Sequence, residues 1–255
     1  MNKLFRDLGH IIANHSVTLA FDFDGTLSEF TEIPREAVVS SEMQKALAKA
    51  QEVANIIVIS SRITPFIRER LKFIRNLQIY GLHGLETPTK NRSISLAEMI
   101  SLVSLKHSVT AIIENERHAR VEDKPAGFSV HFRGASMKEY ENLSLMVRKA
   151  AHNAGFRAYG GNWALEILSN ESPTKAGVLY KIAKNAGKNS ALFYFGDDDA
   201  DEEAFAKVHP FRKVVTVAIG RKNTAAKYAL KDISELMLAI NEISQKINSK
   251  HVKTR

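Results

Sequence analysis

The sequence predicts an α/β protein, with a doubly wound parallel sheet as its core and a smaller α/β domain inserted into that core. Three observations predict this class. Apolar runs typical of buried strands alternate with helix-like segments over the first 84 residues, and the same alternation returns near residue 172. The residues between the two halves follow a different pattern. Parallel sheets that carry helices on both faces produce the alternation seen in the two halves.

The first half is expected to contain three strands and two helices. Residues 17–23 (VTLAFDF) and 53–60 (VANIIVIS) are apolar runs, and the second is typical of a parallel strand buried on both faces. Apolar residues recur at helical spacing in residues 40–52, which predicts a helix. A second helix is expected over 64–73 and a third strand over 77–84 (LQIYGLHG).

The second half repeats this alternation. The expected elements are a helix over 172–187, a strand over 190–199, a helix over 200–209, a strand over 213–220 and a helix over 231–248. The strand over 190–199 (SALFYFGDDD) is apolar until its last residues, which are acidic. Its acidic end is therefore a candidate functional feature.

The middle of the chain predicts a separate domain. Helices are expected over 93–118 and 136–155, a strand over 127–134, and one or two strands over 156–169. A mixed insert between two halves of one sheet suggests a cap that lies over an active site. The expected domains are a core formed by residues 1–88 and 171–255 and a cap formed by residues 89–170.

The composition is that of an ordinary globular protein with a basic balance. Of 255 residues, 44% are hydrophobic, and the formal net charge is +8. A positive balance suits nucleic acid, anionic lipid or a small anionic substrate. No run of Lys and Arg is interleaved with aromatic residues, so nucleic acid is not an expected partner.

Neither a membrane-spanning segment nor a cysteine-based site is expected. No apolar run approaches the roughly 18 residues that span a bilayer, and the first 16 residues lack the apolar stretch of a signal peptide. We therefore expect a cytoplasmic protein without a membrane partner. The chain has no cysteine, which excludes disulfides, thiolate metal sites and cysteine nucleophiles.

Acidic residues follow two of the predicted strands. Asp22 and Asp24 end the first strand, and Asp197, Asp198 and Asp199 end the strand that begins at residue 190. The carboxyl ends of parallel strands share one edge of the sheet, so these groups are expected to meet there. Clustered carboxylates repel one another, and an all-oxygen set of this kind suits Mg²⁺.

Neither a calcium loop nor helix capping accounts for both acidic strand ends. A calcium loop of the EF-hand type needs glycine at its sixth position, where this chain has Leu27 or Glu202. An acid can also cap a helix, and Asp201 is expected to cap the helix that follows it. The sequence contains none of the common serine hydrolase, zinc protease or P-loop motifs, which leaves an aspartate as the candidate nucleophile.

Four segments together resemble the haloacid dehalogenase superfamily of phosphatases. They are DFDGTL (22–27), IIVISSR (56–62), SPTKAG (172–177) and GDDDADE (196–202), and they occur in the superfamily's order. The resemblance implies a Rossmann-like core, with Asp22 as nucleophile and Asp24 as general acid and base. It also implies Ser60 and Lys175 as ligands of the phosphoryl group, and Mg²⁺ held by Asp22, Asp24, Asp197 and Asp198. Asp201 is expected to orient these ligands.

Three further segments resemble the trehalose-6-phosphate phosphatases. They are GLHGLE (81–86), VEDKPAGFSVHFR (121–133) and NWALEI (162–167), whereas Ser61 and Ala200 depart from the family pattern. The resemblance implies trehalose 6-phosphate as substrate. The candidate substrate-binding residues are Thr26, Arg62, His83, Glu122, Lys124, Arg133 and Glu166. Trp163 is a candidate for stacking on the sugar, although packing is the commoner role of such a residue.

Several alternatives stay open at this point. The substrate could be another glycosyl phosphate, such as glucosylglycerol phosphate, sucrose phosphate or mannosylglycerate phosphate. A phosphomutase would use the same aspartate. A third possibility is a non-catalytic regulatory partner of a trehalose synthase, which the intact set of acids argues against. In each case a trehalose-6-phosphate synthase, if it is a partner, is expected to be a separate chain.

Overall fold

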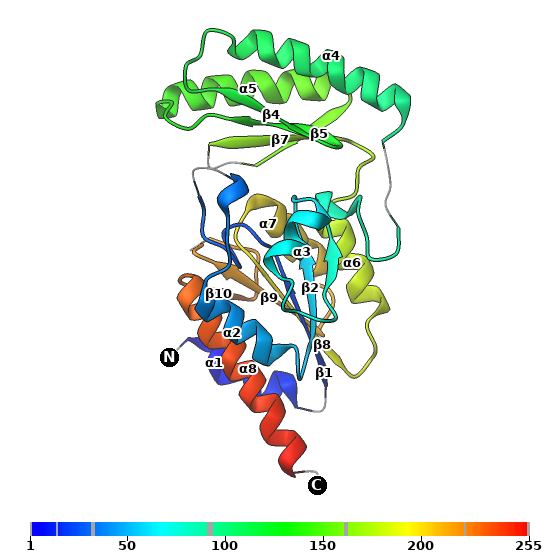
Figure 1. Cartoon of the computed structure of the whole chain (residues 1–255), viewed down its shortest axis with the longest axis vertical. Coiled ribbons are helices and arrows are strands. Elements are labelled where there is room, and N and C mark those ends of the chain that lie inside the picture. The colour runs from blue at the N-terminus through cyan, green and yellow to red at the C-terminus, as the bar shows by residue number, and fades with distance from the viewer. Residues whose placement is uncertain are drawn as a thin grey trace. The chain divides into compact units, whose positions relative to one another are not determined.

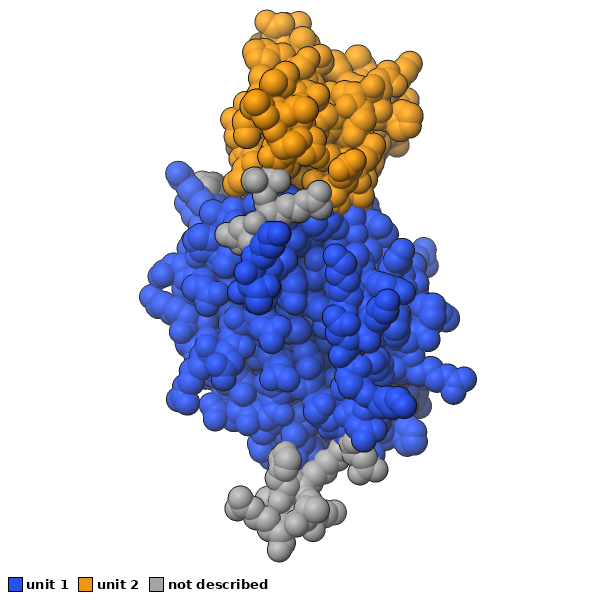
Figure 2. All heavy atoms as spheres, turned by 90° about the vertical axis from the view of Figure 1, so that its right-hand side faces the viewer, with its two compact units in different colours: residues 1–91, 173–255 blue, residues 92–172 orange. Residues whose placement is uncertain are grey.

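The chain folds into two compact units, which Figure 2 shows in different colours. The computed structural model describes residues 2–13, 15–31, 34–90, 94–160, 163–221 and 223–253. Unit 1 is formed by Met1–Asn91 together with Pro173–Arg255, and unit 2 by Arg92–Ser172. The assignment of unit 1 to catalysis and of unit 2 to substrate specificity stays a prediction.

Unit 1 is built on a six-stranded sheet in the order β10-β9-β8-β1-β2-β3. Figure 1 shows strands of this sheet with helices around them. Its strands are β1 (Ser16–Phe21), β2 (Asn55–Ile59), β3 (Gln78–Tyr80), β8 (Ser190–Gly196), β9 (Val214–Ile219) and β10 (Tyr228–Leu230). Each neighbouring pair is parallel. The predicted parallel sheet is therefore confirmed, with its two halves joined where β1 pairs with β8.

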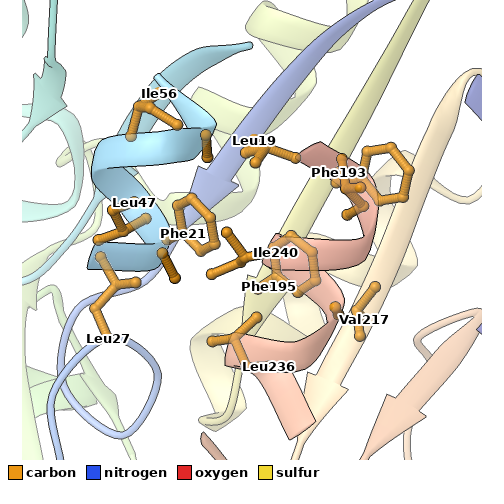
Figure 3. Close-up of a cluster of buried hydrophobic side chains, with 14 of the residues drawn as sticks. Leu19, Phe21, Leu27, Leu47, Ile56, Phe193, Phe195, Val217, Leu236 and Ile240 are labelled. Carbon is orange, nitrogen blue, oxygen red and sulfur yellow. The ribbon is translucent and has the colours of Figure 1, made fainter. Parts of the chain in front are cut away.

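Helices cover both faces of this sheet. They are α1 (Lys3–Ile12), α2 (Ser41–Ala50), α3 (Thr64–Arg70), α6 (Lys175–Asn185), α7 (Asp199–Val208) and α8 (Ile233–Lys253), with short 3-10 helices η1 (Pro34–Glu36) and η2 (Leu82–Gly84). Successive strand side chains point to opposite faces. Leu19 and Phe21 of β1 therefore join one buried cluster with α2 and α8 (Figure 3), whereas Ala20 joins a second cluster with α6 and α7.

Three elements of unit 1 differ from the sequence expectation. The strand expected over 77–84 is only β3, because the chain turns into η2, where Leu82 and His83 have positive φ angles of 48° and 58°. Helix α1 was not expected, although Leu4, Leu8 and Ile12 recur at helical spacing and are buried. Strand β10 was not expected either, since three residues are too few to show a period.

Unit 2 is a two-layer α/β domain. Its antiparallel sheet has the order β4-β5-β7-β6, with β4 (Arg120–Lys124), β5 (Gly127–His131), β6 (Phe156–Tyr159) and β7 (Ala164–Ser169). Helices α4 (Leu96–Ile113) and α5 (Met137–Asn153) lie side by side on one face (Figure 1). Phe128, Val130 and Ile167 are buried with Leu105 and Val147 in one core. The inserted α/β domain is thus confirmed, and β4 is a strand that the sequence pattern did not reveal.

Helix α4 alone among the described helices has the length and composition of a membrane-spanning segment, with a hydropathy of 1.4 over 18 residues. This corrects the expectation that no run reaches that length. The buried side chains of α4 are Leu102, Leu105, Val109 and Ile113, which recur at helical spacing and pack in the core of unit 2. Only 22% of this segment is buried, and a single helix of this length and composition does not by itself show a membrane span. The absence of a membrane partner stays a prediction.

Candidate active site

The acidic residues that follow β1 and β8 lie side by side. Strand β1 pairs with β8 in parallel register, with Phe21 opposite Phe195, and the Asp22 amide donates to the Phe195 carbonyl at 2.9 Å. Asp22 and Asp197 follow these two strands and are both buried. The register of the sheet therefore brings two carboxylates together at its carboxyl edge, as the sequence predicts for a doubly wound sheet.

A third carboxylate completes a compact group. One oxygen from each of Asp22, Asp197 and Asp201 lies within 4.8 Å of the other two, and all three residues are buried. Buried carboxylates at this spacing repel one another unless a cation lies between them, and oxygen donors suit Mg²⁺. The group thus fits a divalent cation. Asp24 and Asp198 are the other ligands that the sequence predicts, and that part of the ligand set stays a prediction.

Asp198 and Asp201 form the capping box of α7. The Asp198 side chain accepts from the Asp201 amide at 2.8 Å, and the Asp201 side chain accepts from the amides of Asp197 at 2.9 Å and Asp198 at 3.2 Å. Asp198 is therefore the N-cap, and the expectation that Asp201 caps this helix is wrong. A capping box satisfies exposed amides reciprocally, so it fixes the start of α7 against the end of β8.

Lys175 is a buried cation within this group of acids. It begins α6, its side chain is 1% exposed, and Thr174 caps the helix. Its Nζ lies 3.0 Å from Asp22 Oδ1, 3.2 Å from Asp198 Oδ2 and 3.1 Å from Asp201 Oδ1. A lysine this deeply buried needs such partners, because an unpaired buried charge is costly. The ammonium group of Lys175 therefore orients Asp22, the candidate nucleophile.

The charges of the site shift one another's pKa values. Burial, reinforced by Asp201 and Asp198, raises the pKa of Asp197 to about 8, and burial raises the pKa of Asp201 to about 6. Burial also raises the pKa of Asp22 well above its usual value, although Lys175 opposes this. For Lys175, burial lowers the pKa, but the surrounding aspartates outweigh it and raise the pKa. Burial and mutual repulsion therefore favour the protonated forms of Asp22, Asp197 and Asp201, whereas a bound cation would favour their ionised forms.

The turn after Asp24 brings the main chain close to Asp197. Gly25 has φ +79°, and a Cβ there would lie 2.2 Å from Asp197 Oδ2. The neighbouring Thr26 is fully buried, and its hydroxyl donates to Asp197 Oδ1 at 3.0 Å. Glycine is needed because any side chain would meet both a strained φ angle and the Asp197 carboxylate. Thr26 therefore contacts a candidate metal ligand, and its predicted role in substrate binding stays a prediction.

We expect Gly25→Ala to lose both stability and the response to Mg²⁺. The added methyl group must displace the Asp197 carboxylate, and the positive φ angle adds roughly 1 kcal/mol of strain. Thermal unfolding with and without Mg²⁺ measures both effects. Gly9→Ala is the matched control, since nothing lies within 4 Å of its Cβ position in α1 and alanine favours helix. An unchanged Mg²⁺ response in Gly25→Ala would contradict this role.

Ser60 and Arg62 lie in the segment that follows β2. Ser60 is fully buried, and its hydroxyl accepts from the Arg62 amide at 3.1 Å. Arg62 donates from Nε to Asp24 Oδ2 and from Nη2 to Asp24 Oδ1, each at 2.7 Å. The structure thus brings together a residue predicted to bind substrate and the residue predicted to be the general acid.

His83 occupies η2, next to this segment. It is 4% exposed, and its amide donates to the Ser60 carbonyl at 2.9 Å. This main-chain bond ties η2 to the end of β2, which fits a structural role for the segment. The predicted contact of His83 with substrate stays a prediction.

The sugar-binding candidates of unit 2 share one face of its sheet. Glu122 of β4 and Glu166 of β7 both lie opposite Ser129 of β5, so their side chains point the same way. Lys124 Nζ lies 2.7 Å from Glu166 Oε1, with side chains 20% and 15% exposed. His131 Nε2 lies 2.7 Å from Glu122 Oε2. These four side chains, of which Glu122 is the most exposed at 41%, form a polar cluster of two contacting pairs rather than a loose surface pair.

Two other unit 2 candidates lie differently. Arg133 is exposed and lies two residues beyond the end of β5. The Trp163 ring lies 4.9 Å from the Tyr140 ring and packs against the unit 2 core, which favours packing over stacking on a sugar.

Two residues near the acids were not predicted from the sequence. The Tyr194 hydroxyl is buried and donates to Asp201 Oδ1 at 2.5 Å. Arg221 donates from Nε to the Asp197 carbonyl and pairs with Asp199 at 2.7 Å. A tyrosine inside an apolar strand just before the acids is a signal that points to the first of these contacts. Arg221 carries no such signal, because it follows β9 and reaches the site only through the fold.

Known proteins resemble this chain in both sequence and fold. A family model described as trehalose-phosphatase matches residues 20–234. The chain is 26% identical over 256 residues to a trehalose 6-phosphate phosphatase of Zea mays, covering 90% of this chain and 70% of that protein. The C-terminal domain of C. albicans trehalose-6-phosphate phosphatase is similar with a TM-score of 0.78 at 17% identity, over 95% of each chain.

A further similar structure comes from a regulatory protein. The C-terminal domain of a Candida albicans trehalose synthase regulatory protein gives a TM-score of 0.69 at 14% identity, over 94% of this chain and 98% of that one. At such identity the two solved structures show the fold alone.

Proposed function

The chain belongs to the trehalose-phosphatase family of the haloacid dehalogenase superfamily, and we propose that it hydrolyses trehalose 6-phosphate to trehalose and inorganic phosphate. One observation carries the hydrolase part of this proposal. Asp22 is a buried carboxylate held at 3.0 Å by a buried lysine, inside a group of acids suited to a divalent cation. This arrangement supports nucleophilic attack on an anionic substrate.

Asp22, Asp197 and Asp201 are the described side chains that would hold Mg²⁺, with Asp198 and the Asp24 carbonyl as further candidates. When bound, the ion supplies positive charge that offsets the repulsion between a carboxylate and a phosphate. The raised pKa values of Asp22 and Asp197 support this fit, since both groups lie where a cation would keep them ionised.

We propose two chemical steps. An Asp22 oxygen forms a bond to phosphorus, the bond from phosphorus to the sugar oxygen breaks, and that oxygen takes a proton from Asp24. Water then attacks the phosphorus of the aspartyl-phosphate and gives a proton to Asp24. The bond to Asp22 breaks, which releases inorganic phosphate and restores both carboxyl groups. Lys175 and Ser60 are proposed to bind the phosphoryl oxygens.

We propose that the polar cluster of unit 2 recognises the sugar. Carboxylates accept hydrogen bonds from paired hydroxyl groups, and Lys124 supplies donors beside Glu166. Glu122 and Glu166 lie on one face of the sheet and therefore present acceptors on the same side. A sugar with many hydroxyl groups suits such a surface better than an apolar substrate does.

Phosphate release from a panel of sugar phosphates tests the proposed function. The panel contains trehalose 6-phosphate, sucrose 6-phosphate, glucosylglycerol phosphate, mannosylglycerate phosphate and glucose 6-phosphate, each with Mg²⁺. We expect trehalose 6-phosphate to give the highest kcat/KM and chelation of the metal to stop release. Preference for another member would keep the chemistry and reassign the substrate. Release from none of them would favour a regulatory role.

Glu166→Gln tests the sugar-binding part of this proposal. The amide keeps the shape but loses the charge and the ion pair with Lys124. We expect kcat/KM for trehalose 6-phosphate to fall about tenfold or more, and kcat/KM for p-nitrophenyl phosphate, which has no sugar, to change less than about threefold. Asp123→Asn, on the same sheet but 73% exposed, is the matched control. Equal losses on both substrates would contradict sugar recognition by Glu166.

A further inference from the structure

We infer that Arg62 is a positioning residue that orients the proton-transferring carboxyl group of Asp24, rather than a ligand of the phosphoryl group. This role rests on the proposed function. This role is supported by a pair of hydrogen bonds between the two side chains, which we call the fork. Nε and Nη2 of Arg62 each donate to a different oxygen of Asp24 at 2.7 Å. A two-point contact fixes both the position and the rotation of a carboxylate.

Arg62 is itself held from several sides. Its amide donates to Ser60 Oγ at 3.1 Å, and its carbonyl accepts from the Leu82 amide at 2.9 Å. Its guanidinium lies 4.7 Å from the centre of the Phe66 ring. That ring packs edge-on against Phe23, the residue between Asp22 and Asp24, at 5.8 Å. The arginine is therefore anchored to the same local structure that carries the two catalytic aspartates.

The fixed position of Arg62 suits a role in orienting Asp24 for proton transfer better than a role in binding the phosphoryl group. To protonate the sugar oxygen, one oxygen of Asp24 must carry a proton and turn it toward the leaving group. The hydrogen bond from Arg62 to that oxygen is then given up, while the bond to the other oxygen holds the group in place. The side chains of Arg62 and Asp24 are 18% and 24% exposed, so water has limited access to them. The orientation of the Asp24 carboxyl group during proton transfer is therefore set by Arg62 rather than by solvent.

The test separates substrates that need the proton from those that do not. The sugar oxygen of trehalose 6-phosphate is a poor leaving group and needs protonation, whereas the aryl oxygen of p-nitrophenyl phosphate leaves without it. For Arg62→Lys and Arg62→Gln we expect kcat on trehalose 6-phosphate to fall about tenfold or more, with KM changed less than about threefold. The rate of p-nitrophenol release in the first turnover should change less than about threefold.

A double-mutant cycle adds a second readout. In an Asp24→Asn background, Arg62→Lys should cause no further loss of trehalose 6-phosphate turnover, because the residue acts through Asp24. Arg70→Lys is the matched control, since Arg70 lies 4.0 Å from the same Phe66 ring and donates to the Ala37 carbonyl. It should keep wild-type rates on both substrates. Thermal unfolding checks that each variant is folded.

Other outcomes overturn the inference. Equal losses on the two substrates, a loss that resides in KM, or independent losses in the double-mutant cycle would assign Arg62 to phosphoryl binding or to general structure. A wild-type protein that turns over neither substrate would instead overturn the proposed function, and with it this role. The two failures are therefore distinguishable by the wild-type rates alone.

Discussion

Replacement of Asp22 by asparagine is expected to reduce phosphate release from trehalose 6-phosphate by about 10⁴-fold or more. An amide has nearly the same shape but is a far weaker nucleophile, so the covalent intermediate cannot form. Lys175 loses one of its three carboxylate partners but keeps Asp198 and Asp201. Release of phosphate over time, with Mg²⁺ in excess, measures the loss.

The loss of activity should occur without loss of the fold. Asp22 is buried, and burial raises its pKa, so removing its charge does not weaken the metal-free protein. Thermal unfolding should therefore show a midpoint at or above that of the wild type. Asp7→Asn is the control, because Asp7 lies in α1, where it accepts from the Tyr228 hydroxyl at 2.9 Å. Retention of more than about one hundredth of wild-type activity in Asp22→Asn would assign the nucleophile to another group.

The sheet could be predicted from the sequence because its strands are buried on both faces. Such strands are continuous apolar runs, as in β2 and β8, and they are visible without any knowledge of their neighbours. The meeting of Asp22 with Asp197 also followed, since parallel strands share one carboxyl edge. Only the register, with Phe21 opposite Phe195, had to come from the structure.

Other parts of the site depend on contacts between distant segments. Lys175 could equally have been a solvated helix lysine, and its three partners show that it is not. The fork between Arg62 and Asp24 joins residues 38 positions apart, and no spacing rule predicts it. The N-cap of α7 is Asp198 rather than Asp201. The sequence places several acids around the start of this helix, and the residue at which β8 ends determines which of them becomes the cap.

Replacement of Asp197 by asparagine is expected to stabilise the metal-free protein and to remove its response to Mg²⁺. Burial, Asp201 and Asp198 raise the pKa of Asp197 to about 8, above the usual value of 3.8. Between these values the folded state binds more protons than the unfolded state, so the free energy of unfolding falls as the pH rises. The slope contributed by this group is at most about 1.4 kcal/mol per pH unit. Asparagine has no such titration and can still accept from Thr26.

Thermal unfolding between about pH 5 and pH 9, with and without Mg²⁺, measures both effects. Without metal, the midpoint of Asp197→Asn should exceed that of the wild type by an amount that grows up to about pH 8 and then levels off. With Mg²⁺ at about pH 8 the order should reverse, because the wild type gains a bound cation and the variant has lost a ligand. Phosphate release should fall about 10³-fold. Equal stabilisation of both proteins by Mg²⁺ would show that Asp197 does not bind the ion. A variant that is less stable than the wild type at every pH would show that the ionised Asp197 carboxylate does not destabilise the metal-free protein.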